Sequence, residues 1–460
     1  MSVLLDRLAA ELGAGGLLTG DEVTARAETW SSPHPCRALA IARPGSAAAV
    51  AAVLRLCHEA GQEVVPHGGG TGLVEGATAG SSQILLSLER LRTIEELDPL
   101  GRTATVQAGV TLQALQDAAR SAGLNFPLDL GARGTATIGG TIATNAGGNR
   151  VLRYGMMRDH VLGIEVVLAD GTILSSLNRL IKNNAGYDLK QLFIGSEGTL
   201  GVVTRAVLRL REDPVSQNVA FLGIGSFDRL PVLLKALDRR LGGTLSAFEV
   251  MWPEFYALVT TPPARNRPPL ASQHAYYCLV ESLGGDESGD HERFLAVLGQ
   301  LVEEGIVADA AVAKSKAQVA GLWALRDDVE QVLRIGPVFM FDVALPIAAM
   351  ENYVAGVRSA LAARWQDAAC VVWGHMGDCN LHLWISVQDE SAAARAAVER
   401  IVYEPLAGIG GSVSAEHGIG TEKAAYLGLV RSPTEVELMR TLKRSLDPRG
   451  IMNPGRVIGC

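Results

Sequence analysis

Three glycine-rich segments constrain the fold of this chain more than any other feature of its sequence. They span residues 66–73, 131–149 and 195–201, and each mixes glycine with threonine, serine or asparagine. Glycine makes up 51 of the 460 residues, about 11% against a usual value of about 7%. Glycine lets backbone N–H groups converge on an anion, and hydroxyl groups add further donors. The three segments together therefore predict a cradle for a diphosphate, although any one of them alone is as compatible with a simple tight turn.

The common nucleotide-binding fingerprints are absent from the sequence. No Gly-x-Gly pair is followed by a glycine three residues on, as a Rossmann unit requires, and no Gly-Lys-Ser or Gly-Lys-Thr marks a P-loop. A Gly-x-Ser-x-Gly nucleophile elbow is also missing. The cradle must therefore belong to another class of nucleotide-binding protein.

Charge and hydropathy exclude two further classes of partner. Lysine and arginine total 41 against 49 acidic residues, a net charge of −8 without a basic block, which argues against nucleic acid as a partner. The most apolar stretch, residues 38–57, is interrupted by Arg43 and Arg55 and is too broken for a membrane helix. The amino terminus carries Asp6 and Glu11 between its leucines, unlike a secretory signal. We expect a soluble, cytoplasmic protein.

Apolar spacing predicts short alternating elements. Helices are expected over residues 3–13, 47–60 and 434–446. Short strands are expected at residues 63–66, 84–88, 103–108, 163–168 and 201–210. The glycine clusters stop at Pro214 and return near residue 408, so we expect domains at residues 1–213, 214–405 and 406–460. No Cys-x-x-Cys pair occurs, and reduced thiols are expected at Cys36, Cys57, Cys278, Cys370, Cys379 and Cys460.

In chain order, the glycine motifs resemble the FAD-binding domain of the vanillyl-alcohol-oxidase (PCMH-type) flavoproteins, and within that family the D-2-hydroxyacid dehydrogenases. The resemblance rests on Pro66-x-Gly-Gly-x-Thr-Gly72, Leu128-Asp-Leu-Gly-Ala132, Ile138-Gly-Gly140, Thr144-Asn-Ala-Gly-Gly148, Arg153-Tyr-Gly155 and Gly195-Ser-Glu-Gly-Thr-Leu-Gly201. It implies an α+β fold, with a PCMH-type FAD-binding domain of two α+β subdomains, an α+β cap domain for the substrate and a C-terminal helical segment that completes the active site.

The same resemblance implies which residues contact FAD. They are Pro66, His67, Gly68, Gly69, Gly70, Thr71, Gly72, Leu73, Leu130, Gly131, Thr135, Gly139, Gly140, Thr144, Asn145, Gly147, Gly148, Arg153, Tyr154, Gly155, Glu197, Gly198, Gly201, Val202 and Asn453. His67 stands where many relatives have arginine or glutamine. Relatives with covalent flavin usually attach it elsewhere in the loop, so we expect non-covalent FAD.

One candidate metal-binding motif is Trp373-Gly-His-Met-Gly-Asp-Cys-Asn-Leu-His-Leu-Trp384. The β-like runs on either side predict a hairpin that turns at residues 378–379. His375 and His382 would then face each other with Cβ atoms roughly 4.5–5.5 Å apart, a separation that lets two imidazoles share one metal ion. Taken alone, two polar side chains on a solvent-facing hairpin are the simpler interpretation.

The segment Ser412-Val-Ser-Ala-Glu-His-Gly-Ile-Gly420 adds a carboxylate and a third imidazole. Two histidines and one carboxylate leave open positions on a metal, as in catalytic sites. In the dehydrogenases that this sequence resembles, His-x-Gly-Asp-Gly-Asn-x-His and Ser-x-Glu-His-Gly are the metal and base motifs. The resemblance thus implies that His375, His382 and Glu416 bind Zn2+ or a similar divalent ion, and that His417 is the general base. Cys379 replaces a glycine of that motif, a change that could strain the turn or offer a thiol, and it is not counted as a metal ligand.

The resemblance implies oxidation of a D-2-hydroxy acid to the 2-oxo acid. The metal lowers the pKa of the substrate hydroxyl, His417 accepts the proton, and the C2 hydride passes to the flavin N5. No second redox motif occurs in the chain, so electrons must leave to an external acceptor such as an electron-transfer flavoprotein, a quinone or a cytochrome. A homodimer is possible, because the sequence leaves the oligomeric state open.

Substrate contacts are implied for Arg326, Met340, Asn380 and His417. The guanidinium of Arg326 suits bidentate binding of a carboxylate, although a surface arginine paired with an acid is the alternative. D-2-hydroxyglutarate dehydrogenases typically carry a lysine where this chain has Met340, and a thioether favours apolar groups, while Glu330 would repel a second carboxylate. We therefore expect a D-lactate-like substrate with a small or apolar side chain. The alternatives are a D-2-hydroxyglutarate or glycolate dehydrogenase and, in a different class, a non-catalytic flavin-binding protein.

Overall fold

The computed structural model describes residues 2–29 and 34–459, which fold as two compact α+β units. Unit 1 consists of Met1–Gly148, Gly155–Asp213 and Glu416–Cys460, and unit 2 consists of Asn149–Tyr154 and Pro214–Ala415. This division differs from the sequence-based domains in two places. Residues 149–154 belong to unit 2, and the chain returns to unit 1 at residue 416 instead of residue 406.

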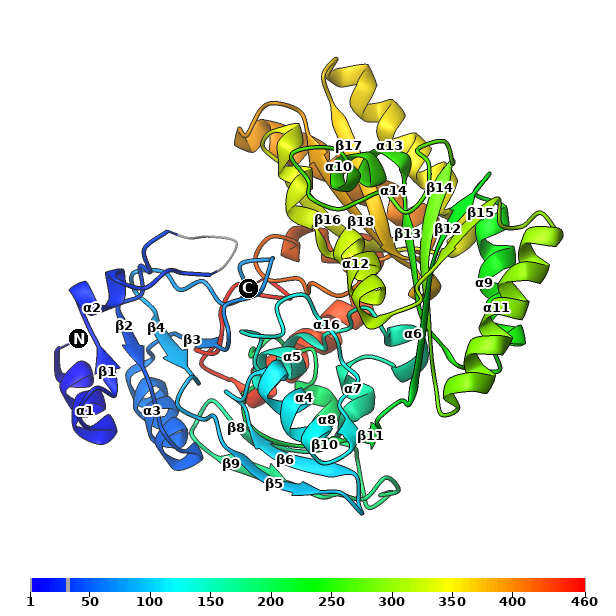
Figure 1. The fold of residues 1–460 in the computed structure, drawn as a ribbon. Coiled ribbons are helices and arrows are strands. Elements are labelled where there is room, and N and C mark those ends of the chain that lie inside the picture. Colours follow the sequence, from blue (N-terminus) through cyan, green and yellow to red (C-terminus); the bar gives the residue numbers. More distant parts are fainter. Residues whose placement is uncertain (1, 30–33, 460) are drawn as a thin grey trace. The chain divides into compact units, whose positions relative to one another are not determined.

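The first sheet of unit 1 contains β1 (Leu17–Leu18), β2 (Ala40–Ala42), β4 (Ile84–Ser87) and β3 (Val64–His67), in that spatial order. The last three strands are parallel, and β1 is antiparallel to β2. Helices α1 (Ser2–Leu12) and α3 (Ala47–Ala60) share an apolar core with this sheet (Figure 1). Helix α3 begins at Ser46, whose hydroxyl accepts the N–H of Ala49, and ends at Gly61 in the left-handed region.

The second sheet of unit 1 is antiparallel. Its spatial order is β5 (Ile94–Asp98), β6 (Thr103–Gln107), β10 (Val202–Arg209), β8 (Val161–Val167) and β9 (Ile173–Ser176). Helices α4 (Leu112–Ser121) and α5 (Ile138–Thr144) bury Leu112, Leu115, Ile138 and Ile142 in the core beside it. The sheet and these helices hold the second and third glycine segments.

Shorter elements complete unit 1. They are α2 (Asp21–Thr24), β7 (Leu124–Asn125), α7 (Met157–His160), α8 (Lys190–Phe193), β11 (Arg211–Glu212) and α15 (Leu427–Val430). The longer helix α16 (Pro433–Leu446) starts with a capping box in which Ser432 and Glu435 each accept from the other residue's backbone N–H.

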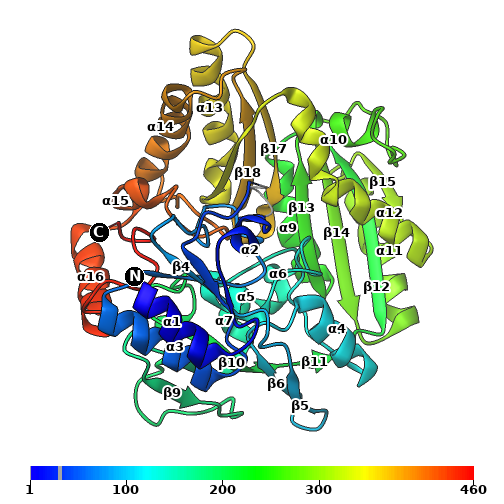
Figure 2. The same ribbon diagram turned by 90° about the vertical axis from the view of Figure 1, so that its left-hand side faces the viewer.

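Unit 2 is built on one antiparallel sheet of seven strands (Figure 2). Its spatial order is β15 (Asp309–Val312), β12 (Ser216–Ile224), β14 (Tyr276–Gly284), β13 (Leu245–Met251), β17 (Ala369–His375), β18 (Asn380–Ser386) and β16 (Phe339–Ala344). The central strands β13 and β14 are buried along almost their whole length, as expected for a sheet that is covered on both faces.

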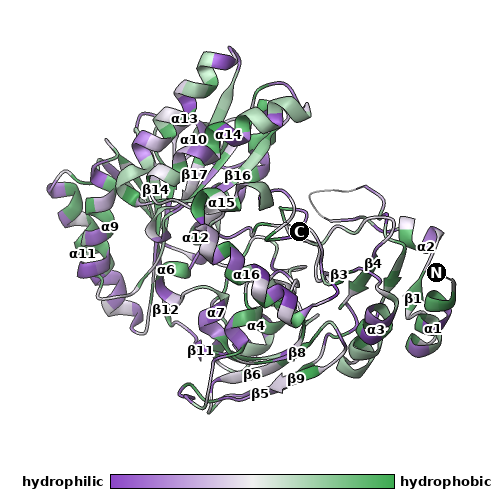
Figure 3. Ribbon diagram, turned by 180° about the vertical axis from the view of Figure 1, so that it is seen from behind, coloured by the Kyte–Doolittle hydropathy of each residue, from purple (hydrophilic) through white to green (hydrophobic). Residues whose placement is uncertain are grey.

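Helices cover both faces of this sheet. On one side, α10 (Pro253–Thr260), α12 (Lys316–Asp327) and the 3-10 helix η1 (Val329–Ile335) share an aromatic core with the sheet. On the other side lie α9 (Arg229–Arg240) and α11 (Glu287–Glu303) (Figure 1). Helix α11 alternates hydrophilic and hydrophobic colour in Figure 3, because Phe294, Val297, Leu298 and Leu301 form one buried stripe.

The two departures from the expected domains have structural causes. Residues 149–154 include the short helix α6 (Val151–Tyr154), and Arg150 pairs with the fully buried Glu281 of β14 through contacts of 2.8 and 3.2 Å. Helices α13 (Met350–Arg364) and α14 (Ala392–Gly408) pack together, and Ser412 then pairs with Ala344 of β16. The chain therefore continues the unit 2 sheet beyond α14.

The expected elements correspond to structural ones. The helices expected over residues 3–13, 47–60 and 434–446 are α1, α3 and α16, and the five expected strands are β3, β4, β6, β8 and β10. Five cysteines are free thiols, while Cys460 lies outside the described residues. None of the described helices combines the length and the apolar character needed to span a bilayer.

Candidate active site

A cavity in unit 1 brings the three glycine segments together. The predicted FAD contacts that line it are Pro66, His67, Gly68, Gly69, Gly70, Thr71, Gly72, Leu73, Leu130, Gly131, Gly139, Gly140, Thr144, Gly147, Glu197, Gly198, Gly201 and Val202. Glu416 and His417 line the same cavity. Segments more than 300 residues apart in the chain therefore line one cavity, and the predicted base His417 is among its lining residues.

The remaining predicted FAD contacts do not line this cavity within the described part of the chain. Thr135, Asn145, Gly148, Gly155 and Asn453 belong to unit 1, whereas Arg153 and Tyr154 belong to unit 2. Arg153 is used inside unit 2, because its guanidinium donates to the carbonyl of Leu283 on β14. Asn145 ends helix α5 with φ of 50° and accepts the N–H of Arg158 through its side chain.

Other residues that the sequence motifs did not indicate also line the cavity. They are Val74, Gly76, Ala77, Leu88, Ala132, Ala136, Thr137, Thr141, Ala143, Ala146, Phe193, Ser196 and Val203. Most of them stand inside or beside the recognised motifs, so a wider window around each motif would have found them. Leu88 carries no such signal, because it follows strand β4 in a part of the chain without glycine clusters.

The chemistry of the lining fits FAD. Among the described residues it contains no lysine or arginine, so backbone N–H groups and hydroxyls such as that of Thr71 are the donors for a diphosphate. Gly69 lies so close to the next loop that a Cβ there would be 2.0 Å from the carbonyl oxygen of Thr135. Burial lowers the pKa of His67, which favours a neutral imidazole facing the cavity.

The C-terminal segment forms hydrogen bonds with two separate segments beside this cavity. Residue 452 pairs with Val64 of β3, whose strand leads into the first glycine segment. The Nδ2 of Asn453 donates to the carbonyls of Gly76 and Glu197 at 3.0 and 2.7 Å. Asn453 therefore links two of the loops that line the cavity.

Unit 2 carries a buried polar cluster on one face of its sheet. Glu249 of β13 accepts a hydrogen bond from Nε of Arg326 at 2.8 Å, and its other oxygen lies 2.7 Å from Nδ1 of His375. A nitrogen of Arg326 is also 2.9 Å from Nε2 of His375. Burial alone would raise the pKa of Glu249, but the charges of His375 and Arg326 outweigh it and lower the pKa to about 2. Glu249 thus joins the predicted substrate arginine to a predicted metal ligand.

His382 stands beside a second buried acid. It lies opposite Asp342 in the β16–β18 pairing, and its Nδ1 is 3.8 Å from Oδ1 of Asp342. The rings of His375 and His382 are 5.3 Å apart and nearly perpendicular. Two predicted metal ligands are therefore close together in unit 2, and Asp342 offers a carboxylate next to one of them.

The hairpin register differs from the prediction. His382 pairs with Trp373, not with His375, because the connection contains a 3-10 turn at Met376–Asp378 and is centred one position earlier than expected. Moving the partner by two residues leaves both histidines on the same face. Cys379 follows in the left-handed region with φ of 72°, so the expected strain at this position is present.

The donor set in unit 2 fits a divalent metal. Two ligand atoms that are each about 2.0–2.2 Å from one ion can be separated by the 3.8 Å found between His382 and Asp342. His375 is engaged differently, since both of its ring nitrogens face Glu249 and Arg326. Glu249 and Asp342 are the site residues that sequence analysis missed, and a lone acid in each apolar strand was the available signal.

The predicted substrate residues lie on neighbouring strands of unit 2. Met340 pairs with Trp384, and Asn380 pairs with Ala344 at the end of the same β16–β18 ladder. Met340 and Asp342 are two residues apart on one strand, so they point to the same face. Arg326 is buried on α12, which removes the alternative of a surface arginine but confirms its pairing with an acid.

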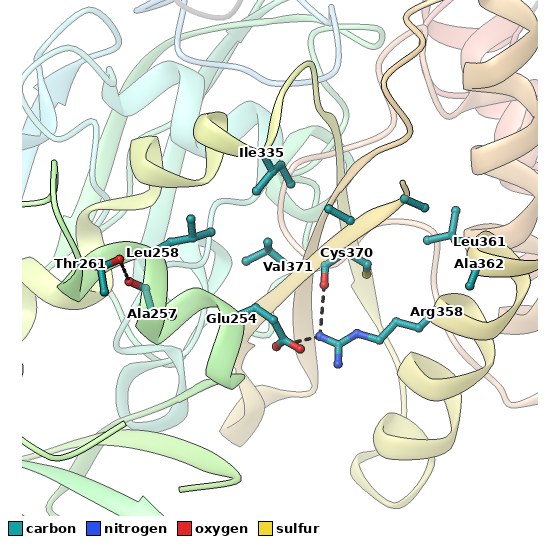
Figure 4. Close-up of a pocket in the computed structure, with 12 residues that line it drawn as sticks. Glu254, Ala257, Leu258, Thr261, Ile335, Arg358, Leu361, Ala362, Cys370 and Val371 are labelled. Atoms are coloured by element: carbon teal, nitrogen blue, oxygen red, sulfur yellow. Dashed lines mark hydrogen bonds and ion pairs between the residues drawn. The ribbon is translucent and has the colours of Figure 1, made fainter. Parts of the chain in front are cut away.

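A second cavity in unit 2 holds none of the predicted site residues. It lies between α10, α13 and the start of β17, and apolar side chains such as Leu258, Leu361 and Val371 line it (Figure 4). Its charged groups are paired, because Arg358 donates to Glu254 at 3.0 Å and to the carbonyl of Cys370 at 3.1 Å.

Comparison with known proteins identifies the family. Residues 213–457 match the family described as FAD linked oxidases, C-terminal domain, and residues 38–176 match the FAD binding domain family. A Bos taurus protein named D-2-hydroxyglutarate dehydrogenase, mitochondrial, is 42% identical over 417 residues, which cover 90% of this chain and 76% of the relative. This chain belongs to the FAD-linked D-2-hydroxyacid dehydrogenases.

Other similarities agree with this assignment. This chain is 41% identical over 433 residues to a Xanthomonas citri pv. viticola protein named D-2-hydroxyglutarate dehydrogenase. The match covers 93% of this chain and 90% of that protein. The fold of this chain resembles that of p-cresol methylhydroxylase with a TM-score of 0.79 at 16% identity, over 99% of this chain and 96% of that one. The dehydrogenase is therefore an FAD-dependent oxidoreductase acting on CH–OH groups, with the PCMH-type α+β fold.

Proposed function

We propose that this protein oxidises a D-2-hydroxy acid to the 2-oxo acid in a metal-dependent reaction. The observation that carries the proposal is the cavity of unit 1, in which His417 lies among the glycine segments that suit FAD. Bound FAD would supply a two-electron acceptor for the C2 hydride, and a divalent ion would supply a Lewis acid for the substrate oxygens. His417 would accept the hydroxyl proton, a task that suits an imidazole near neutral pH.

For the metal, we propose His382, His375 and Glu416 as ligands, with Asp342 as a fourth candidate. Chain connectivity supports Glu416, because it directly follows Ala415, whose N–H donates to Asp342 at 3.0 Å. Adjacent Cα atoms are only about 3.8 Å apart. Because His375 already contacts Glu249, Asp342 is a better second metal ligand beside His382 than His375 is.

Metal dependence is tested by removing the ion and, separately, one ligand. Verified metal removal should abolish turnover while the yellow flavin stays bound, and His382→Ala should do the same. His417→Ala should keep metal and flavin but lower the rate of flavin reduction by roughly 10²–10⁴. Full activity after complete metal removal would rule out the metal role, and an unchanged reduction rate in His417→Ala would rule out the base.

We propose that the substrate side chain is small or apolar, as in D-lactate or D-2-hydroxybutyrate. Met340 and Trp384, paired two residues from Asp342 and His382, pack in the apolar core of unit 2 and carry no charge, and a second carboxylate buried without a cation costs several kcal/mol. Arg334 is a basic residue of the same unit, but it already donates to the carbonyls of Leu258, Thr261 and Pro262.

D-2-hydroxyglutarate is the second candidate substrate, because the relatives at 42% and 41% identity are named for it. Anaerobic mixing with D- and L-lactate, D-2-hydroxybutyrate and D-2-hydroxyglutarate, followed by the bleaching of the flavin, compares the candidates directly. We expect the D-monocarboxylates to have the higher kcat/KM. A clear advantage for the dicarboxylate would show that a cation meets its second carboxylate, and no bleaching with any of them would favour a non-catalytic flavoprotein.

Three further properties stay proposals. The flavin is expected to be non-covalent, so the denatured protein should have the mass of the polypeptide alone. Its electrons are expected to leave to an external acceptor. A cytoplasmic location is a proposal, whereas the Bos taurus relative is named mitochondrial, and cell fractionation distinguishes the two.

A further inference from the structure

A buried carboxylate in unit 1 accepts hydrogen bonds from the segment that follows His417. The two carboxylate oxygens of Glu197 accept the backbone N–H groups of Ile419 at 2.7 Å and of Gly420 at 2.8 Å. Gly418 and Gly420 both have positive φ, at 88° and 53°. Such a backbone turns successive N–H groups toward one point and forms a nest for an anion. The anion in this nest is the side chain of Glu197.

The glycine at position 418 is required by this contact. A Cβ at Gly418 would lie only 2.8 Å from Oε1 of Glu197 and 3.0 Å from its carboxyl carbon. The absence of a side chain at Gly418 therefore lets the chain pass around the carboxylate of Glu197.

Glu197 is itself held firmly in the wall of the cavity. Its N–H donates to the carbonyl of Ala143 at 2.8 Å, and its own carbonyl accepts Nδ2 of Asn453 at 2.7 Å. Its φ of 51° lies in the left-handed region. The carboxylate therefore extends from a fixed point of the third glycine segment.

We propose that Glu197 is a positioning residue that orients His417 in the flavin cavity. This inference rests on the proposed role of His417 as the base. The resemblance had made Glu197 a contact of FAD, but both carboxylate oxygens are already used by the backbone two and three residues after His417. A shift of about 1 Å in a reacting group can cost about 100-fold in rate, so a loosened nest would slow proton transfer without removing the flavin.

The test is Glu197→Gln, which keeps the shape of the side chain but replaces one acceptor oxygen with an NH2 group that cannot accept. We expect the FAD content to be unchanged and the anaerobic rate of flavin reduction to fall by about 10- to 100-fold. Glu75→Gln is the matched control. Glu75 is exposed and accepts the hydroxyl of Thr421 in the same segment, so this variant should reduce its flavin at the normal rate.

Gly418→Ala approaches the same contact from the other side and covers the case in which Glu197→Gln does not fold. It should cause a similar loss of rate with FAD retained. A double variant, Glu197→Gln with His417→Ala, should be no slower than His417→Ala alone, because the orienting group has nothing left to orient.

Each result is decisive. A normal reduction rate in Glu197→Gln, with His417→Ala slow, would overturn this inference and leave the proposed base intact. Loss of FAD from both Glu197→Gln and Gly418→Ala would overturn it in favour of a flavin contact or a structural role. A further loss in the double variant would show that Glu197 acts independently of His417. A normal rate in His417→Ala would instead refute the proposed function on which the inference rests.

Discussion

His160 should make unit 1 sensitive to mild acid. It ends helix α7 and has no exposed surface. Its ring packs edge-on against that of Phe126, with the ring centres 5.5 Å apart. Burial, and to a smaller extent the positive charge of Arg211, lower the pKa of His160 from 6.5 to about 4.

The sign and size of the effect follow from linkage. Above pH 6.5 the imidazole is neutral in both the folded and the unfolded chain, and stability is complete. As the pH falls through 6.5, the imidazole of His160 binds a proton in the unfolded chain, whereas in the folded chain it stays neutral until about pH 4. The free energy of unfolding therefore falls by about 1.4 kcal/mol per pH unit in this window. The total loss is about 3 kcal/mol, of which about 2 kcal/mol falls between pH 7.5 and pH 5.0.

Replacing His160 by leucine should remove this part of the pH dependence. Urea unfolding of the holoprotein at pH 7.5 and 5.0, followed by the fluorescence of released flavin, gives the loss of stability for each protein. The loss on acidification should be about 2 kcal/mol smaller in His160→Leu than in the parent, whatever the fixed cost of the substitution. His34→Gln, at an exposed histidine, is the control and should behave like the parent. An equal loss on acidification in the parent and in His160→Leu would refute the reasoning.

Three other predictions concern the cavity of unit 1, a buried ion pair and the histidine hairpin of unit 2. A Cβ at Gly131 or Gly134 would meet nothing within 4 Å, but only Gly131 lines the cavity, so Gly131→Leu should lose FAD absorbance while Gly134→Leu keeps it, and equal retention would contradict the cradle. The buried ammonium of Lys443 donates to Asp447 and to two backbone carbonyls, and Lys443→Met should lower the free energy of urea unfolding by about 3–5 kcal/mol because Asp447 keeps an unpaired charge. Cys379→Gly should raise stability by about 1 kcal/mol by relieving the left-handed φ of 72°, and a lower Tm would contradict this.

The local part of the architecture could be predicted from short stretches of sequence. Helix α3 was predicted from its apolar spacing, and the glycine segments were recognised as one cradle although they are far apart in the chain. These features depend on backbone preferences and periodicity, which act over a few residues. The resemblance to a flavoprotein family added the function, because its motifs are themselves short and local.

The strand register of the hairpin that carries His375 and His382 could not be predicted from local sequence. Its existence and the shared face of His375 and His382 were predicted, yet His382 pairs with Trp373. Register depends on how many residues the turn absorbs, and here a 3-10 turn and a left-handed Cys379 move the centre by one position. The geometry of three or four turn residues decided a contact that the strand pattern alone leaves open.

The sequence by itself determined which chemistry this protein carries: the glycine loops, the two histidine motifs and the family to which they belong. Only the tertiary structure decided how these groups are held. Glu249 reaches His375, Arg150 reaches Glu281 and Glu197 reaches the segment after His417 across 126, 131 and more than 220 residues of chain. No local preference encodes such pairs, because each forms only when strand register and core packing bring distant segments together, and the burial that results makes an unpaired charge too costly.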